Sequence, residues 1–260
     1  MDKADRLLRR TVRACRDAAT PTALLAAVVD ALQPDVPSDR WCVLTLDPAT
    51  TLPTGGLHEH GVSPTLAPRM LELEFGGGDV NALTDLARGR QAVATLDGAT
   101  QGDRQRSPRY RGVLAPDGLA HELRAVFRDG HGAWAAMVLM RGDGAPDFSA
   151  AEQALVAGLA EPVTRALRRV LLMGQIAAQA SAQAPAMLLL DGGAQLTLRH
   201  ASATAAHWLA QIDDGSAGEL PYALLSLAQR ARSTGGGAMT RLRARSGRWL
   251  TAHAEALGDE

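Results

Sequence analysis

The stretch Ala120-His-Glu-Leu-Arg-Ala-Val-Phe-Arg-Asp-Gly-His-Gly-Ala-Trp-Ala-Ala-Met-Val-Leu-Met140 decides the fold. Its apolar residues predict two strands, over 120–127 and 133–140, and a Gly-rich turn at 129–132 separates them. A third strand is predicted over 41–46, before Asp47-Pro48. We therefore expect a mainly antiparallel sheet that contains these strands.

A helix is predicted directly after this pair of strands. Ser149 precedes Glu152 by three positions, which is the spacing of an N-terminal capping box. The helix is expected to cover 150–175 and to leave the domain. Such an exit is typical of a sensor domain that passes its state to something downstream.

The remaining elements indicate an α+β protein with two domains. Thr20-Pro21 predicts a junction between two helices within 4–33, because Thr can cap a helix and Pro is favoured in its first turn. The first domain, residues 1–172, has further predicted strands at 52–57 and 91–96, helices at 68–73 and 79–88, and a polar loop at 97–106. The second, residues 180–260, has predicted strands at 186–191, 195–199, 239–245 and 248–257 and helices at 201–212 and 220–233.

Composition excludes several classes of protein. The 27 basic and 28 acidic residues give a formal net charge of -1, so no global field attracts the chain to nucleic acid or to an anionic membrane. Cys15 and Cys42 fall in a predicted helix and a predicted strand, so no disulfide framework is encoded. No apolar run approaches the roughly 20 residues that span a bilayer, and no signal peptide is present. We expect a cytoplasmic protein without a membrane partner.

Several motifs resemble a known family. These are Asp47-Pro-Ala-Thr-Thr-Leu-Pro-Thr-Gly55, Arg106-Ser-Pro-Arg-Tyr-Arg111, Leu119-Ala-His-Glu-Leu-Arg124, Trp134, and Phe148-Ser-Ala-Ala-Glu152. They look like the GAF-type sensory region of actinobacterial LuxR-family transcriptional regulators, over nearly all of 1–172. The following segment is similar to a PAS-like domain, with Ser246-Gly-Arg-Trp-Leu250 at its penultimate strand.

The resemblance implies a GAF-like antiparallel sheet with helices, then a smaller PAS-like α+β domain. It also implies a C-terminal helix-turn-helix, which residues 180–260 do not offer. We therefore expect a truncated chain whose PAS-like domain is incomplete at its C-terminus. DNA would be contacted only through a helix-turn-helix domain that these 260 residues lack.

No catalytic motif is recognisable in the sequence. His58-Glu59-His60 has no third ligand at a recognised spacing, so we predict surface histidines and no metal site. His121 and Glu122 are interpreted as ordinary polar residues at the start of a strand. Without a nucleophile accompanied by a base, the chain is not expected to be an enzyme, and the sequence names no cofactor.

Any ligand pocket is expected in the first domain, between the sheet and 79–110, because binding residues concentrate on loops carried by a rigid sheet. Trp134 would form the floor of this pocket, with Trp41 beside it. The predicted rim residues are Asp79, Asn81, Arg109 and Tyr110. The competing interpretations are that Asp79 caps a helix, that the arginines near Arg109 lie in solvent, and that both tryptophans are core residues.

The preferred function is a sensory module that binds a small-molecule effector and shifts the packing of the helix at 150–175. The alternatives are a ligand-free dimerisation or protein-interaction module and, less favoured, an enzyme of unknown class.

A homodimer is expected because two helices carry apolar stripes that an exit helix could not bury on a domain it is leaving. The stripe residues are Leu7, Leu8, Val12, Leu155, Val156, Leu159, Val163, Leu167, Val170 and Leu171.

Overall fold

The computed structural model describes residues 2–58, 60–177, 185–192, 196–212 and 220–256. The helices in 1–177 are α1 (Lys3–Arg16), α2 (Pro21–Leu32), α3 (Ala67–Gly76), α4 (Leu83–Arg88), α5 (Leu96–Thr100), α6 (Ala150–Gly158) and α7 (Ala160–Ala177). Short 3-10 turns η1 (Pro64–Leu66), η2 (Arg104–Arg106) and η4 (Ala115–Asp117) and the π-helix η3 (Tyr110–Leu114) join them. The strands are β1 (Arg40–Leu46), β2 (Pro53–Leu57), β3 (Val93–Thr95), β4 (Leu119–Asp129) and β5 (Gly132–Gly142).

A five-stranded antiparallel sheet forms the centre of this unit, in the order β2-β1-β5-β4-β3. The α+β class and the strands predicted at 41–46, 120–127 and 133–140 are confirmed. The β4–β5 hairpin closes at Gly132, whose φ of 133° favours glycine. A Cβ there would also lie 2.7 Å from Cβ of Pro48, so the turn requires glycine for space as well.

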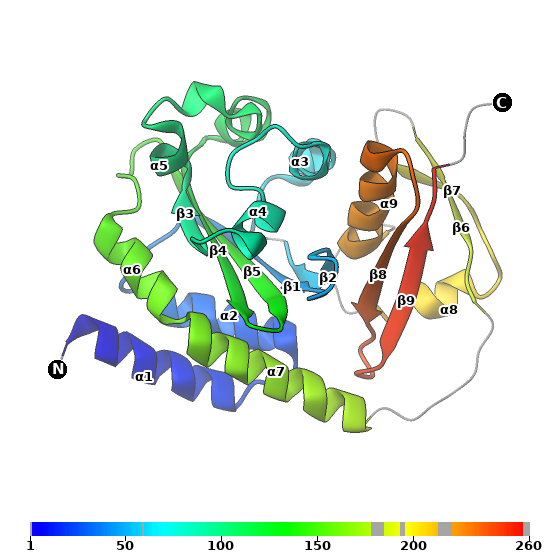
Figure 1. Ribbon diagram of the computed structural model, residues 1–260, viewed down its shortest axis with the longest axis horizontal. Coiled ribbons are helices and arrows are strands. Elements are labelled where there is room, and N and C mark those ends of the chain that lie inside the picture. Colours follow the sequence, from blue (N-terminus) through cyan, green and yellow to red (C-terminus); the bar gives the residue numbers. More distant parts are fainter. Residues whose placement is uncertain (1, 59, 178–184, 193–195, 213–219, 257–260) are drawn as a thin grey trace.

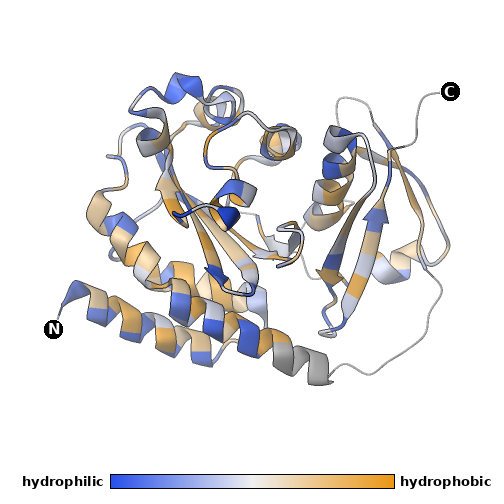
Figure 2. Ribbon diagram, viewed as in Figure 1, coloured by the Kyte–Doolittle hydropathy of each residue, from blue (hydrophilic) through white to orange (hydrophobic). Residues whose placement is uncertain are grey.

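Each face of the sheet is covered by its own set of helices, and this makes three layers (Figures 1 and 2). Helices α1, α2, α6 and α7 pack on one face through the main apolar core, which includes Leu123, Met137 and Leu139 from the strands. Helices α3, α4 and α5 and the π-helix η3 lie over the other face, against Leu44, Val138 and Met140. Side chains alternate between these faces along most of each strand, and the alternation is interrupted where the register shifts, near Leu46, His121 and Arg128.

Two predicted helix starts are confirmed by their caps. Thr20 Oγ1 accepts a hydrogen bond from the Ala23 amide, and Pro21 is the first residue of α2. At α6, Ser149 and Glu152 form the reciprocal capping box. Each cap satisfies amides that the helix itself leaves without a partner.

The prediction of one continuous helix over 150–175 is wrong, because α6 ends at Gly158 and α7 begins at Ala160. Pro162 explains the break: it has no amide hydrogen to donate to the Gly158 carbonyl, and its ring would clash with that carbonyl.

The apolar stripes from which a homodimer was predicted are mostly buried within one chain. Leu7, Leu159, Val163 and Leu167 are at most 2% exposed within a single chain, where α7 packs across α1, α2 and the sheet. Leu8 is 38% exposed, and Val12 and Leu155 are half-buried. The stripes thus form the core of one chain, and their burial needs no second copy.

Two local predictions fail in the segment from 79 to 106. The helix predicted over 79–88 begins only at Leu83, and its N-cap is Ala82, so Asp79 does not cap it. The polar loop predicted at 97–106 contains α5 and η2, and Thr100 in it is buried. Thr95 Oγ1 caps α5 by accepting from the Gly98 amide, a signal that the polar composition of the segment obscured.

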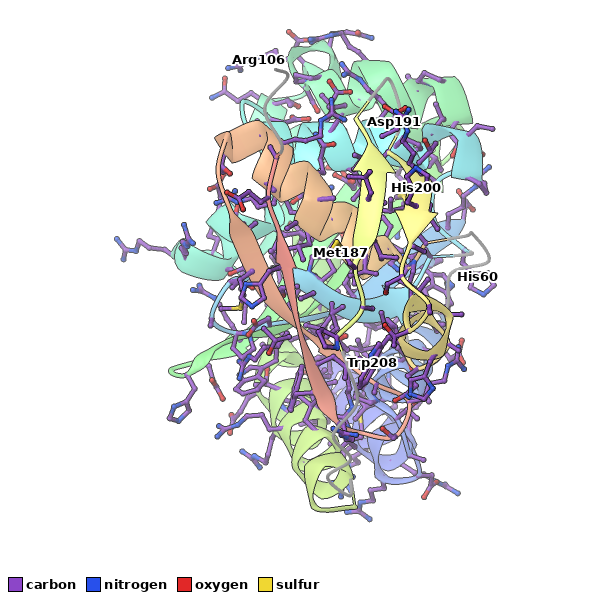
Figure 3. The ribbon with its side chains drawn as sticks, turned by 90° about the vertical axis from the view of Figure 1, so that its right-hand side faces the viewer. His60, Arg106, Met187, Asp191, His200 and Trp208 are labelled. Atoms are coloured by element: carbon purple, nitrogen blue, oxygen red, sulfur yellow. The ribbon has the colours of Figure 1, made fainter. Side chains whose placement is uncertain are left out.

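The second unit contains β6 (Leu188–Asp191), β7 (Thr197–Ala201), α8 (Ala205–Leu209), α9 (Tyr222–Thr234), β8 (Ala238–Arg243) and β9 (Trp249–Ala254). Its strands form two separate antiparallel hairpins, β6–β7 and β8–β9. Figure 3 shows the β6–β7 hairpin on the outer side of the molecule, with Met187 at its start. The PAS-like character of this unit and the division into 1–172 and 180–260 stay predictions.

The second unit docks on β2 and α3 of the first (Figure 1). Leu52, Leu71 and Phe75 form an apolar cluster with Leu227 of α9. Beside it, Arg241 Nη2 lies 2.7 Å from Oδ1 of Asp47, which is only 1% exposed. The described docking surface thus combines an apolar patch, this ion pair and the buried Arg243, which donates to the Val170 and Leu171 carbonyls of α7.

We expect Leu167→Ala to lower the free energy of unfolding by about 2–5 kcal/mol, because the side chain is fully buried and its loss leaves a cavity. The matched control on the same helix is Arg165→Ala, whose side chain is 77% exposed; it should change that energy by no more than about 0.5 kcal/mol. Urea denaturation followed by circular dichroism measures both. Equal stability of the two variants would contradict burial of the stripe within one chain.

Candidate functional site

A cavity of about 90 Å³ lies between the sheet and helices α3 and α4. Its floor is formed by β1 and β5 residues on the face opposite the main core, and Met70, Phe75 and Leu83 form walls from the helices. The full lining is Cys42, Leu44, Thr51, Pro53, His58, Gly61, Val62, Ala67, Met70, Glu74, Phe75, Leu83, Thr84, Arg124, Val138, Met140 and Tyr222. One water needs about 10–15 Å³ by the same kind of measure, so the cavity has room for a small organic molecule.

The second unit supplies one residue of this lining. Tyr222, the first residue of α9, stacks on His58 with ring centroids 4.2 Å apart and planes inclined by 29°. His58 was predicted to be a surface histidine, but it lines the cavity just after β2. The docking surface of the second unit therefore closes one side of the cavity.

Buried charges form a network beside the cavity. Arg109 donates from Nη2 and Nε to Oε2 of Glu122, at 2.8 and 3.2 Å, and its Nη1 lies 3.4 Å from Oδ2 of Asp79. Arg124 Nη1 donates to Glu74 Oε2 at 2.6 Å, and its Nε lies 3.1 Å from Glu122 Oε2. All five side chains are at most 7% exposed.

The guanidinium groups keep Glu122 ionised. Burial alone would raise the pKa of its carboxyl group, but the charges of Arg109 and Arg124, together with the hydrogen bonds that Arg109 donates, outweigh burial and hold this pKa below its ordinary value. Burial likewise opposes the charge of Arg124, yet Glu122 and Glu74 raise its pKa further, so it stays protonated. Glu122 and Arg124 therefore keep their charges near neutral pH.

The network leaves one donor beside the cavity without a hydrogen bond. Arg124 Nε is buried and makes none within the described part of the chain, since its contact with Glu122 lacks hydrogen-bond geometry. Arg124 itself lines the cavity. An unsatisfied buried donor costs about 1–3 kcal/mol, which an acceptor on a ligand would recover.

The four predicted rim residues come together in the fold, but none of them lines the cavity. Asp79 Oδ2 accepts a hydrogen bond from the Arg109 amide at 2.7 Å, and Arg109 Nη2 donates to the Val80 carbonyl. Asn81 Nδ2 donates to the Thr95 carbonyl, and Tyr110 packs into the small core around Leu96 and Leu114. These residues therefore support the wall of the cavity from behind.

The predicted placement of the two tryptophans is wrong. Trp41 and Trp134 pack against the main core, on the face of the sheet covered by α1, α2 and α7. Trp134 Nε1 donates to Asp129 Oδ1 at 3.0 Å, and the Arg168 guanidinium lies over its ring. Trp134 and Trp41 therefore do not line this cavity, and both are half-buried against the main core.

Several residues that line the cavity were not predicted, because little in the sequence around them indicates a binding site. Glu74 and Arg124 have the right chemistry, but a lone charge in a predicted helix or strand is usually exposed to solvent. Tyr222 lies about 165 residues from the end of β2, which it approaches, so only the fold reveals its role. Cys42 was noticed solely as a free thiol.

Nothing in the described lining combines a nucleophile with a base that could activate it. Burial raises the pKa of the Cys42 thiol to about 12, so the thiol is not a thiolate nucleophile at neutral pH. Both carboxylates near the cavity are held by guanidinium groups. The described arrangement suits binding of a mostly apolar molecule.

Comparison with known proteins finds no matching family model and no matching curated protein. Among solved structures, the chain is similar to the GAF domain of a phosphoenolpyruvate-protein phosphotransferase from Acinetobacter, at 14% identity and a TM-score of 0.45, covering 67% of this chain and 98% of that one. It is also similar to an N-acylhomoserine lactone-dependent LuxR-family transcription factor from Burkholderia cenocepacia, at 14% identity and a TM-score of 0.43, covering 66% and 99% of the two chains.

A further similar structure is the ligand-binding domain of VqsR from Pseudomonas aeruginosa, at 16% identity and a TM-score of 0.43, covering 63% of this chain and 96% of that one. All three TM-scores are below 0.5, so the function of this chain has to be argued from its own residues.

We expect Glu122→Gln to lower the free energy of unfolding by about 3–5 kcal/mol, because it leaves two buried guanidinium groups without their shared carboxylate. The matched control is Glu161→Gln, whose side chain is 79% exposed.

The pH dependence gives a second readout. The pKa of Glu122 is lowered in the folded state, so its contribution is present above the unfolded pKa of about 4.3 and is lost as pH falls through the lower folded value. The Gln variant should lose this part of the acid dependence in urea denaturations between about pH 3 and pH 7. An unchanged acid profile would contradict the ionised state of Glu122.

Proposed function

We propose that this chain is the sensory module of a LuxR-type helix-turn-helix transcriptional regulator, and that it binds a small molecule in the cavity between the sheet and α3. The observation that carries this proposal is the cavity itself, which has apolar walls, one guanidinium group beside it and a side closed by a different unit of the chain. Ligand sites combine these features, since apolar walls supply affinity and a few fixed polar groups supply orientation.

The wall chemistry favours a neutral ligand with one hydrogen-bond acceptor. Arg124 Nε can donate, whereas Glu74 already accepts from Arg124 and from the Leu83 amide. The buried network contains the carboxylates of Glu74, Asp79 and Glu122 against two guanidinium groups, so it has an excess of negative charge. This excess disfavours a carboxylate ligand, and a ketone, ester or amide fits better.

The signal would pass through Tyr222 rather than through an exit helix. A ligand that touches both α3 and Tyr222 binds with different affinity to the docked and undocked arrangements of the second unit, and so shifts their populations. The receiver in this proposal is a helix-turn-helix DNA-binding domain outside these 260 residues, in the cytoplasm. Among the described residues, no helix is long and apolar enough to cross a membrane.

A ligand-free interaction module is the second candidate. The observation that favours it is the exposure of Met187 at 75% and Leu189 at 38% on the outer hairpin. In that case the cavity would stay empty or hold water. The two candidates differ in whether the cavity takes an organic molecule.

The test is a thermal-shift screen of the full chain against neutral ketones, esters and amides, together with native mass spectrometry of freshly purified protein. A ligand at about 100 times its Kd adds about 2.7 kcal/mol of stability, which corresponds to a shift of roughly 5–10 °C. We expect such a shift for at least one compound, or a co-purified molecule in the native spectrum.

The matched variants are Ala67→Phe, which fills the cavity from the start of α3, and Ala154→Phe, which adds the same ring at an exposed position of α6. Only the first should abolish the shift. Trp134→Phe should leave the affinity unchanged, because Trp134 lies on the other face of the sheet. A clean apo mass with no shift in the screen would favour the interaction module.

A further inference from the structure

A second group of side chains lies away from the cavity, where three segments of the first unit meet. Asp97 is on α5, His121 is near the start of β4, and Asp147 lies two residues before the cap of α6. In Figure 1, α5 and the start of α6 lie at the same end of the molecule. The sequence separations of these residues show no recognised metal-site spacing, so sequence reasoning predicted no metal site.

Both carboxylates face the same ring nitrogen. His121 Nδ1 lies 2.8 Å from Asp97 Oδ2 and 3.8 Å from Asp147 Oδ1. One N–H can serve only one of these oxygens well, so a neutral imidazole leaves Asp147 without an equivalent bond from it. His121 is 8% exposed, whereas the side chains of Asp97 and Asp147 are 18% and 33% exposed.

Few arginine side chains offset the negative charge of Asp97 and Asp147. Arg104 Nε lies 3.4 Å from Asp97 Oδ1. Arg141 donates to Glu152 and to the backbone carbonyls of Pro146 and Asp147, so these donors are engaged away from the Asp147 carboxylate. The carboxylates of Asp97 and Asp147 both approach His121 Nδ1, so their negative charges repel each other. A cation between the two carboxylates would relieve this repulsion.

The separations suit one small dication. The ligand atoms of Asp97, His121 and Asp147 all lie within 4.8 Å of one another. Zn²⁺ binds oxygen and nitrogen at about 2.0–2.2 Å, so two ligands on opposite sides of one ion are at most about 4.2 Å apart. The 2.8 and 3.8 Å distances from His121 Nδ1 to the two carboxylates already satisfy this limit. A small side-chain adjustment would bring the two carboxylate oxygens within it as well.

We propose that Asp97, His121 and Asp147 form a binding site for a transition-metal dication of the Zn²⁺ or Mn²⁺ type. One imidazole with two carboxylates is a donor set for these ions, whereas Ca²⁺ and Mg²⁺ prefer oxygen alone. His121 would bind through Nδ1 with its proton on Nε2, so the proton now shared with Asp97 leaves Nδ1. The ion would tie α5 and the start of α6 to the sheet. This inference does not depend on the proposed ligand or on DNA.

The test is isothermal titration of the chelator-treated full chain with ZnCl₂ and, separately, MnCl₂, with native mass spectrometry for stoichiometry. We expect one ion per chain, and a thermal midpoint that rises with the ion. His121→Ala should weaken binding at least 10-fold. His131→Ala is the control, because His131 is an exposed histidine in the β4–β5 turn; it should bind as the parent chain does.

Asp147→Asn is the second variant, because it keeps the hydrogen bond between Asp97 and His121 and so preserves the local fold. It should also weaken binding at least 10-fold while its circular dichroism spectrum stays unchanged. Two results would overturn the proposal. One is the absence of stoichiometric binding of either ion. The other is binding that both folded variants retain, which would assign the ion to other residues.

Discussion

The Glu122 carboxylate, held between two guanidinium groups, is the interaction on which the first unit depends. Arg109 and Arg124 bind the same oxygen, and they connect β4 to the segment before η3 and, through Glu74, to α3. An isolated carboxylate could not stay ionised in this environment, because the cost of removing it from water is several kcal/mol. The pair of arginines therefore fixes the distance between α3 and the sheet, and the cavity lies in the gap that remains beside these charges.

Among the described residues, apolar packing and an ion pair hold the second unit in place, together with hydrogen bonds from Arg243 to α7. The apolar cluster of Leu52, Leu71, Phe75 and Leu227 removes area from water and supplies most of the affinity. The Asp47–Arg241 pair has one partner 44% exposed, so it contributes little energy and mainly sets the orientation. Interfaces between units of one chain are usually small enough to allow relative motion, so Tyr222 can respond to the contents of the cavity.

Local signals in the sequence predicted most of the first unit. Thr20, Ser149 and the apolar strands act through neighbours a few residues away, and the structure confirms them. Pro162 was an equally local signal that was overlooked, and it divides the exit helix. Local signals could not predict on which face of the sheet the side chains of Trp41 and Trp134 lie. A shift of one residue turns a strand side chain to the opposite face. The register of β4 on β5 does shift between Phe127 and Arg128.

The candidate site was predicted less well, because its residues meet only through long-range packing. Asp79 has the sequence signature of a helix cap, but its carboxylate binds the amide and the side chain of Arg109, thirty positions away. Nothing within a few residues of Asp79 reveals that partner. The chemistry of Arg109 and Glu122 was visible in the sequence, whereas their burial and pairing were not.

Three groups beside the cavity keep one protonation state near neutral pH. A general acid or base works best when its pKa lies near the working pH, so that it can exchange a proton during the reaction. Here the pKa of Glu122 is held low, that of Arg124 is held high and that of Cys42 is raised to about 12. Groups that keep one protonation state are poor proton carriers. They are, however, fixed donors and fixed charges, and these orient a bound molecule at little cost in reorganisation.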